Sequence, residues 1–289
     1  MDRIRNRNRT QRLHSGKTMK QVAIIGAIAK YTPSELRLYV NSITKSGFIG
    51  KKIMLVYDVP TETTEYLKEN GWEVYRGQLQ QHVILQRFYD VANLIDSLSD
   101  VDYIIWTDVR DVIFQNNITD WLFNKQYPPL VVVKEGIRLQ DEQWAVVNCG
   151  TTFPEEWNRI KQRDSVCTGI IGGTPHRVRD LFKEMYRWSI TSSNPEQLAD
   201  QAALNVLLSF SHFDGVWQSE VRDGLGAHMG VIWQYKDSHR DKLTQQPPRV
   251  TSHGQIVTTM GNDTVIPCII HQYDRDPILK VIMEKLYGA

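Results

Sequence analysis

Short apolar runs alternate with amphipathic segments along the first half of the chain. The runs are bounded by turn residues, which is typical of buried strands. The segments between them repeat apolar residues every three or four positions, as an amphipathic helix does. This alternation predicts a mostly parallel sheet joined by right-handed crossovers, and therefore an α/β fold. The expected strands are 21–29, 52–57, 72–75 and 103–107, and the expected helices are 33–45, 61–70 and 82–98.

The second half of the chain has a weaker pattern. Residues 214–263 are rich in Gly, His, Pro and Gln and are expected to form long loops with short strands. No repeat or linker divides the chain, so we expect one compact domain with a nucleotide half at 20–135 and a more variable half at 136–289. The other expected elements are strands at 130–133 and 265–271 and helices at 175–188, 195–210 and from Pro277 onward.

Charge is distributed unevenly along the chain. The 289 residues carry 34 Lys and Arg against 33 Asp and Glu, a formal net charge of +1. The segment 1–20 holds seven basic side chains and one acidic one, so its net charge is +6 and that of the rest is −5. Residues 1–19 interleave Arg with Asn and are predicted to be a disordered basic arm.

Cysteine usage and hydropathy indicate the compartment. The three cysteines are widely spaced and form no CxxC pair, so neither a disulfide framework nor a zinc site is expected. The longest apolar run, 22–29, is far shorter than the roughly 20 residues that cross a bilayer. We expect a soluble cytoplasmic protein without a transmembrane segment, and the basic arm leaves weak attachment to an anionic membrane surface open.

The strongest candidate for chemistry is the segment 104–114. An apolar strand there runs directly into Asp108 and Asp111. Ligands of open parallel sheets bind beyond the carboxyl ends of the strands, where both side chains would project. Two neighbouring carboxylates repel each other, and a divalent cation such as Mg²⁺ or Mn²⁺ relieves the repulsion through oxygen ligands. An ordinary strand-end turn with a surface Asp–Arg pair explains the segment equally well.

Three later segments carry further candidate residues. The small residues around Gly169 allow a backbone to approach a ligand, although a plain strand–turn–helix connection has the same composition. Asp200 and Gln201 open a DQAALN stretch on a helix, where a solvated polar face with a capping acid is the alternative. His271 ends an apolar strand and is either a core histidine or a metal ligand. Arg275 follows it, with a planar fork suited to phosphate.

In their order and spacing, the four segments resemble the metal-dependent nucleotide-sugar glycosyltransferases of the GT-A fold. The similarity is greatest to the glycogenin and lipopolysaccharide galactosyltransferase group, and it covers about Val22 to Arg275. That group has a DxD motif at a strand end, an Asn/Thr-x-Gly segment, a DQxxLN helix and a late strand ending in His. The resemblance implies a single GT-A, Rossmann-like α/β domain whose mostly parallel central sheet is flanked by helices. Residues 20–135 would be its nucleotide-sugar-binding half and residues 136–289 its acceptor-binding half.

The resemblance also implies a reaction and a set of site residues. A sugar would pass from a nucleoside-diphosphate sugar of UDP or GDP type to a hydroxyl of a glycan or glycoconjugate acceptor. Asp108, Asp111 and His271 would hold Mn²⁺ or Mg²⁺, and Asp108 would also touch the donor ribose. Asp200 would be the catalytic carboxylate. It would act as a general base if the configuration inverts, or place and stabilise the sugar if the configuration is retained, toward which the resemblance leans. The donor would further contact Arg87, Arg110, Gly169, Gln201, Arg275, Tyr31 and Asp58.

Some positions depart from the pattern of that group. The carboxylates are spaced DxxD, so Arg110 is the alternative to Asp111 at the position of the second aspartate. The Gly and Lys-Pro-Trp that follow the late His in the group are missing, and Arg275 is the candidate replacement for the lysine. Arg87 is either a contact to the donor or a snorkelling side chain paired with Asp90, and the two interpretations are equally favoured.

Two other functions use parts of the same sequence. A metal-dependent phosphoryl or nucleotidyl transferase would use the same carboxylates, but it needs an early glycine-rich phosphate loop that 27–31 does not supply. A nucleic-acid-binding protein would use the basic arm, which has no aromatic residue to stack on bases, so a solubilising or cloning-derived tail is favoured. Four tryptophans of the second half are candidates either for stacking on an acceptor sugar or for the core: Trp144, Trp157, Trp217 and Trp233.

Overall fold

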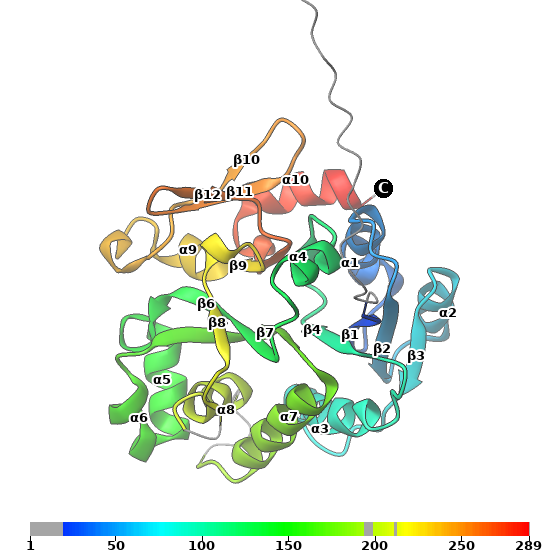
Figure 1. Cartoon of the computed structure of the whole chain (residues 1–289), viewed down its shortest axis with the longest axis horizontal. Helices are drawn as coiled ribbons and strands as arrows, with labels where there is room; N and C mark the ends of the chain where they lie inside the picture. Colours follow the sequence, from blue (N-terminus) through cyan, green and yellow to red (C-terminus); the bar gives the residue numbers. More distant parts are fainter. Residues whose placement is uncertain (1–19, 194–198, 211–212, 289) are drawn as a thin grey trace, which may run out of the picture.

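The computed structural model of the chain describes residues 20–193, 199–210 and 213–288 (Figure 1). The predicted basic arm at 1–19 lies outside the described residues, as does the start of the helix expected at 195–210. In the described part, no helix is both long and apolar enough to cross a membrane.

A seven-stranded sheet forms the centre of the molecule, in the order β3-β2-β1-β4-β7-β6-β8. The strands β3, β2, β1 and β4 run parallel, β7 is antiparallel to both of its neighbours, and β8 is parallel to β6. The predicted α/β fold with a mostly parallel central sheet flanked by helices is therefore confirmed, as a single Rossmann-like domain. The strands are β1 Val22–Ala29, β2 Lys51–Tyr57, β3 Glu73–Arg76, β4 Tyr103–Thr107, β6 Leu130–Arg138, β7 Asp164–Gly173 and β8 Trp217–Ser219.

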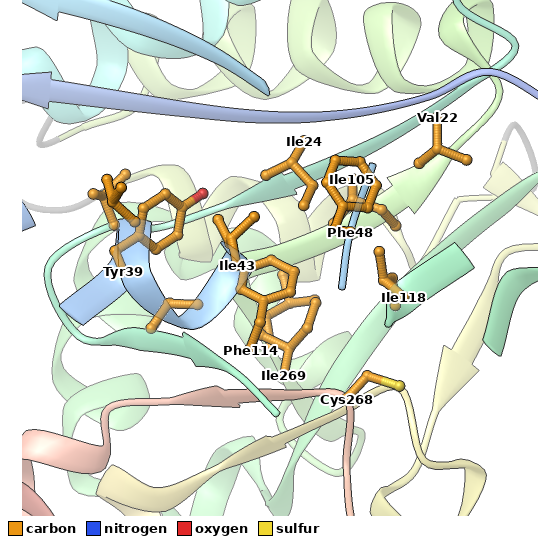
Figure 2. Packing of buried hydrophobic residues seen from close by; sticks show 14 of the residues in the cluster. Val22, Ile24, Tyr39, Ile43, Phe48, Ile105, Phe114, Ile118, Cys268 and Ile269 are labelled. Atoms are coloured by element: carbon orange, nitrogen blue, oxygen red, sulfur yellow. The ribbon is translucent and has the colours of Figure 1, made fainter. Parts of the chain in front are cut away.

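Helices cover both faces of this sheet. Successive residues of a strand point to opposite faces, and the strands here are apolar on both faces, so both have to be covered. Ile24 and Ile105 pack on one face, whereas Ile25 and Trp106 pack on the other. Figure 2 shows the first cluster, where Tyr39 and other α1 side chains meet the sheet. The first face is covered by α1 Pro33–Lys45 and α4 Ile118–Asn124, and the second by α3 Val83–Ile95, α7 Pro175–Ile190 and α8 Ala199–Leu207 (Figure 1).

Local signals set several helix starts. At α1 the carboxylate of Glu35 accepts a hydrogen bond from the Thr32 backbone N–H at 2.8 Å, which is part of a capping box, and Pro33 lies in the first turn. α3 begins after His82, whose Nδ1 accepts from the Ile84 N–H at 3.3 Å. The short helix α2 spans Thr61–Glu69, close to its expected bounds.

The second half departs most from the prediction. The late strand expected at 265–271 is only β13 Ile269–His271, because Pro267 has no N–H to donate to a ladder. The region 214–263 contains a helix, α9, as well as short strands. The elements that the pattern did not predict are β5 Val112–Phe114, β7, α4, α5 Gln143–Thr152, α6 Pro154–Ile160 and α9 Met229–Tyr235, whereas β9 Gly226–His228 is one of the short strands expected over 214–263.

Two small sheets and a terminal helix complete the second half. One sheet has the order β5-β13-β9, and the other joins β10 Arg249–Val250, β11 Ile256–Met260 and β12 Asp263–Val265. The helix α10 Pro277–Tyr287 packs against α1 (Figure 1). All three cysteines are buried and free. Short 3-10 turns lie at Leu139–Asp141, Val221–Asp223, Arg240–Lys242 and Tyr273–Arg275.

Candidate functional site

A cleft of about 870 Å³ opens at the carboxyl ends of β1 and β4. In open sheets with parallel strands this edge is where ligands bind. The cleft draws on segments that are far apart in the chain. The residues proposed from sequence that line it are Tyr31, Arg87, Asp108, Arg110, Asp111, Asp200, Gln201 and Arg275.

Three potential metal ligands meet at the floor of this cleft, where Asp108 and Asp111 line the cleft and His271 is buried beside them without lining it. One ligand atom from each of Asp108, Asp111 and His271 lies within 4.8 Å of the others. The pairing of β13 with β5 sets His271 opposite Val112, and the Gln272 N–H donates to the Asp111 carbonyl at 2.7 Å. These backbone bonds hold the imidazole beside the carboxylates, from which it is far removed in the sequence.

The His271 ring has the surroundings of a metal ligand. It is 3% exposed, and among the described residues neither ring nitrogen finds a hydrogen-bond partner. Its Nε2 lies 3.4 Å from Asp108 Oδ2 and 3.7 Å from Asp111 Oδ1. Adjacent ligands of a six-coordinate cation stand about 3 Å apart when the bonds are about 2.1 Å long. The three side chains therefore fit a divalent cation after a small inward shift.

Gly169 makes room for this ring. A Cβ added there would lie 2.3 Å from His271 Cε1, far inside van der Waals contact. Gly169 is not among the residues that line the cleft, so its place in the structure is behind the imidazole.

The pKa values of the two aspartates are shifted in opposite directions. Burial favours the neutral form of Asp108, but Arg87 and His271 outweigh it and hold the pKa of Asp108 well below its usual range. Burial raises the pKa of Asp111, and His271 only partly opposes the rise. The pKa of His271 is raised because burial, which lowers it, is outweighed by the two carboxylates. A proton on His271 thus offsets part of the charge of the carboxylates, and a cation that binds to the three side chains would displace that proton.

Arg87 connects the acidic floor to α8. Its two terminal nitrogens contact Asp108 Oδ1 at 2.6 Å and Asp200 Oδ2 at 3.0 Å, and the guanidinium lies over the Trp106 ring at 5.4 Å. The alternative pairing of Arg87 with Asp90 is wrong. Asp90 instead accepts hydrogen bonds from Tyr57 at 2.8 Å and from Gln86 at 3.0 Å.

The DQAALN segment faces the sheet. Asp200 and Asn205 are 4% and 3% exposed, so the alternative of a solvated polar face is wrong. The Asn205 amide accepts from the Val166 N–H at 3.1 Å and donates to the Val166 carbonyl at 2.9 Å, which ties α8 to β7. This bond pair places Asp200 and Gln201 on the cleft wall.

The site contains a carboxylate and an imidazole that sequence reasoning missed. Glu135 lines the cleft, accepts from Ser165 Oγ and from Gln201 Nε2 at 3.2 Å, and lies 3.2 Å from His228 Nε2. His228 also lines the cleft and packs edge-on against His271, with ring centroids 4.8 Å apart. Glu135 comes just after an apolar strand run, the same signal that marked Asp108, but His228 has no such signal.

The remaining candidates divide between the cleft and other places. Asp58 directly follows β2 as an exposed residue with φ +48° and does not line the cleft. Trp144 and Trp233 line the cleft as half-buried side chains. Trp217 stacks on Trp121 with ring centroids 5.5 Å apart, and Trp157 packs in a core cluster under α5.

The sequence matches no known protein family model and no curated protein.

Proposed function

We propose that this protein is a divalent-metal-dependent glycosyltransferase. It would move a sugar from a nucleoside-diphosphate sugar of UDP or GDP type to an acceptor hydroxyl. The observation that carries the proposal is the convergence of Asp108, Asp111 and His271 within 4.8 Å at the floor of a large cleft that the two aspartates line. The four sequence segments that resemble such enzymes, around Asp108, Gly169, Asp200 and His271, thereby meet in and around this cleft.

Mn²⁺ or Mg²⁺ is the cofactor that this donor set suits. Two carboxylates and one imidazole are acceptable to Mn²⁺, and the carboxylates also to Mg²⁺, which commonly shares ligands with substrate phosphates. The bound ion would neutralise the charge that grows on the leaving diphosphate. The same three residues would orient the donor by fixing the ion at the cleft floor.

Two arginines would assist at the diphosphate. Arg110 and Arg275 line the cleft, and both side chains are exposed enough to reach a ligand. A guanidinium binds phosphate oxygens through two parallel hydrogen bonds, which suits the diphosphate of a nucleotide sugar. Tyr31, at the end of β1, lines the same cleft and would lie toward the nucleobase.

Asp200 would face the sugar being transferred. Its carboxylate is held by Arg87 at 3.0 Å and by the Thr168 hydroxyl at 3.4 Å. Burial raises the pKa of this carboxylate, and the ion pair with Arg87 only partly opposes the rise. With its direction fixed by Arg87 and its pKa raised, Asp200 suits both roles that the sequence leaves open, which are placing and stabilising the sugar and removing the acceptor proton.

The acceptor would be a glycan or glycoconjugate. Trp144 and Trp233 line the cleft, and half-buried indoles offer a flat apolar face to a sugar ring. Gln234, beside Trp233, also lines the cleft and would hydrogen-bond sugar hydroxyls.

Calorimetric titration with UDP and with GDP, each with and without Mn²⁺, tests the proposal. We expect one nucleotide to bind tightly only when Mn²⁺ is present, and Asp111→Asn to abolish that dependence. Asp263→Asn, the same change at an exposed position of β12, is the control and should bind as the original protein does. If neither nucleotide binds in a metal-dependent way, the glycosyltransferase proposal is wrong.

A further inference from the structure

Gln272 lines the cleft directly after His271, and its backbone has an unusual conformation for its residue type. With φ +55° and ψ 36° it lies in the left-handed region, which glycine adopts freely and other residues adopt at a cost. Such residues persist where their surroundings hold them, and they are concentrated at functional sites. Here the Gln272 N–H donates to the Asp111 carbonyl at 2.7 Å, and the Gln272 carbonyl accepts from the Arg275 N–H at 3.3 Å. The residue is thus fixed between the candidate ion ligands and a guanidinium of the cleft.

Three glutamines of the described chain line the cleft, and two of them already use their side-chain amides. Gln201 donates to Glu135 at 3.2 Å, and Gln234 donates to the Tyr235 hydroxyl at 3.0 Å. The half-buried amide of Gln272 makes no hydrogen bond to any other residue that the structure describes. Its two N–H donors and its oxygen are therefore available to a ligand in the cleft.

Gly230 on α9 gives this amide its place. A Cβ added at Gly230 would overlap Gln272 Oε1 and lie 3.1 Å from Gln272 Cδ. Gly230 lines the cleft as well, so the amide packs against the cleft wall at a position that only a glycine leaves open. The backbone bonds and this contact together define where the amide lies.

We propose that the side-chain amide of Gln272 hydrogen-bonds to the diphosphate of the nucleotide sugar. This inference rests on the proposed glycosyltransferase function. The neighbours of Gln272 are the ion ligands Asp111 and His271 on one side and Arg275 on the other, and these groups would act on the same diphosphate. Glutamine side chains donate to phosphate oxygens in other phosphate-binding proteins, and the amide adds a donor without adding charge.

The variant Gln272→Ala removes the amide and tests the contact by calorimetry with Mn²⁺ present. We expect the Kd of the nucleotide that the original protein binds, UDP or GDP, to rise about tenfold, and that of inorganic pyrophosphate to rise equally. A loss of this size is typical of a hydrogen bond to a charged group. Gln126→Ala is the matched control, because Gln126 is also left-handed, with φ +59°, but is exposed and does not line the cleft.

The outcomes separate this inference from the proposed function. Unchanged nucleotide affinity in Gln272→Ala would overturn the inference and leave the glycosyltransferase proposal intact. A weaker affinity for the nucleotide with unchanged pyrophosphate affinity would overturn it too, since the contact would then not be to the diphosphate. If the original protein binds neither UDP nor GDP in a Mn²⁺-dependent way, both proposals are wrong.

Two further variants separate binding from a purely structural role. Gln272→Gly suits the left-handed backbone, so we expect the Tm not to fall while nucleotide affinity falls as in Gln272→Ala. Gly230→Ala keeps Gln272 but displaces its amide, and it should weaken nucleotide binding to a similar extent. The double variant Gly230→Ala/Gln272→Ala should then bind no more weakly than Gln272→Ala alone. Losses that add in the double variant, or full affinity in Gln272→Gly, would overturn the assignment.

Discussion

The contact between Gly169 and His271 shows how a single residue shapes the site. The imidazole rests where the side chain of any other amino acid would be, and this lets it approach Asp108 and Asp111. The geometry of the site therefore depends on the absence of a Cβ atom at position 169. Protein interiors are packed closely enough that even one methyl group has to be accommodated there.

Gly169→Ala is expected to weaken metal binding by displacing His271. The new Cβ would lie 2.3 Å from the ring, and β7 is a central strand that cannot move away. Overpacking typically costs about 1–3 kcal/mol, so thermal stability should fall as well. Mn²⁺ affinity, measured by electron paramagnetic resonance, should drop at least about tenfold. Gly150→Ala on α5 is the control, because the nearest atom there is 3.8 Å away, and unchanged Mn²⁺ affinity in Gly169→Ala would contradict the prediction.

Glu135 gives the stability of the protein a pH dependence. Its pKa is 4.5 in an ordinary environment and about 7 in the fold. Between these values the native protein holds a proton that the unfolded chain has lost, so the free energy of unfolding falls as the pH rises. The total change is on the order of 3 kcal/mol. Urea unfolding at pH 5 and pH 7.5 without metal should show a smaller decrease for Glu135→Gln than for the original protein, and equal decreases would refute the assignment.

The small sheet β5-β13-β9 is the element that assembles the floor of the cleft. Its strands are three residues long, and β13 sets His271 opposite Val112 on one side and His228 on the other. Strands this short are stabilised by what surrounds them more than by their own ladder. The Ser42 hydroxyl on α1 accepts a hydrogen bond from the Phe114 N–H at 3.0 Å. The side-chain amide of Gln115, the residue after β5, donates to the backbone carbonyls of Ile256 and Pro267.

Gln115→Leu is expected to destabilise this part of the fold. The buried amide donates to the carbonyls of Ile256 and Pro267 at 3.1 and 3.0 Å, and it accepts from the Ile256 N–H at 2.5 Å. Leucine would leave these backbone groups buried without partners, at a cost of about 1–3 kcal/mol for a group that is fully unsatisfied. Urea unfolding should show a loss of about 2 kcal/mol or more. Gln78→Leu, at an exposed position, should change stability by less than about 0.5 kcal/mol.

At the scale of the whole molecule, charge and ligand binding are linked. The chain from Gln21 onward has a net charge of −5, and five carboxylates line the cleft: Asp108, Asp111, Glu135, Glu142 and Asp200. A doubly charged diphosphate would be repelled there. A divalent cation and the guanidinium groups of the cleft would have to offset this repulsion before a nucleotide sugar can bind.

Thermal unfolding should therefore respond to metal and nucleotide together. Neither Mn²⁺ nor UDP or GDP alone is expected to shift the Tm much. Together, at about 100 times the dissociation constant, they would add about 2.7 kcal/mol, which is roughly 5–10 °C for a chain of this size. Asp111→Asn should abolish the joint shift. An equal shift in the presence of a chelator would show that the nucleotide binds without the metal.

The fold and the site differ in how far the sequence predicts them. The first half follows the predicted order of strands and helices, because each element there is marked by its own periodicity and by local caps such as Thr32 and Glu35. The antiparallel direction of β7 in the sheet is not predicted, since the periodicity of a buried strand does not reveal its direction. The short elements β5, β9 and α9 have too few residues to show any period.

The candidate site divides in the same way. By itself, the sequence determined the two carboxylates beyond β4, the buried face of the DQAALN helix and a histidine at a strand end, because each of these signals lies within a short stretch of chain. The tertiary structure alone decided three other features. Arg87 bridges Asp108 and Asp200, which lies 113 residues after Arg87 in the sequence. The His271 ring packs against Gly169, where a larger residue would not fit, and Glu135 lines the cleft. Contacts between residues that are far apart in the sequence depend on how the helices and strands pack together. That packing is set by the whole core, so it leaves no pattern in a local stretch of sequence.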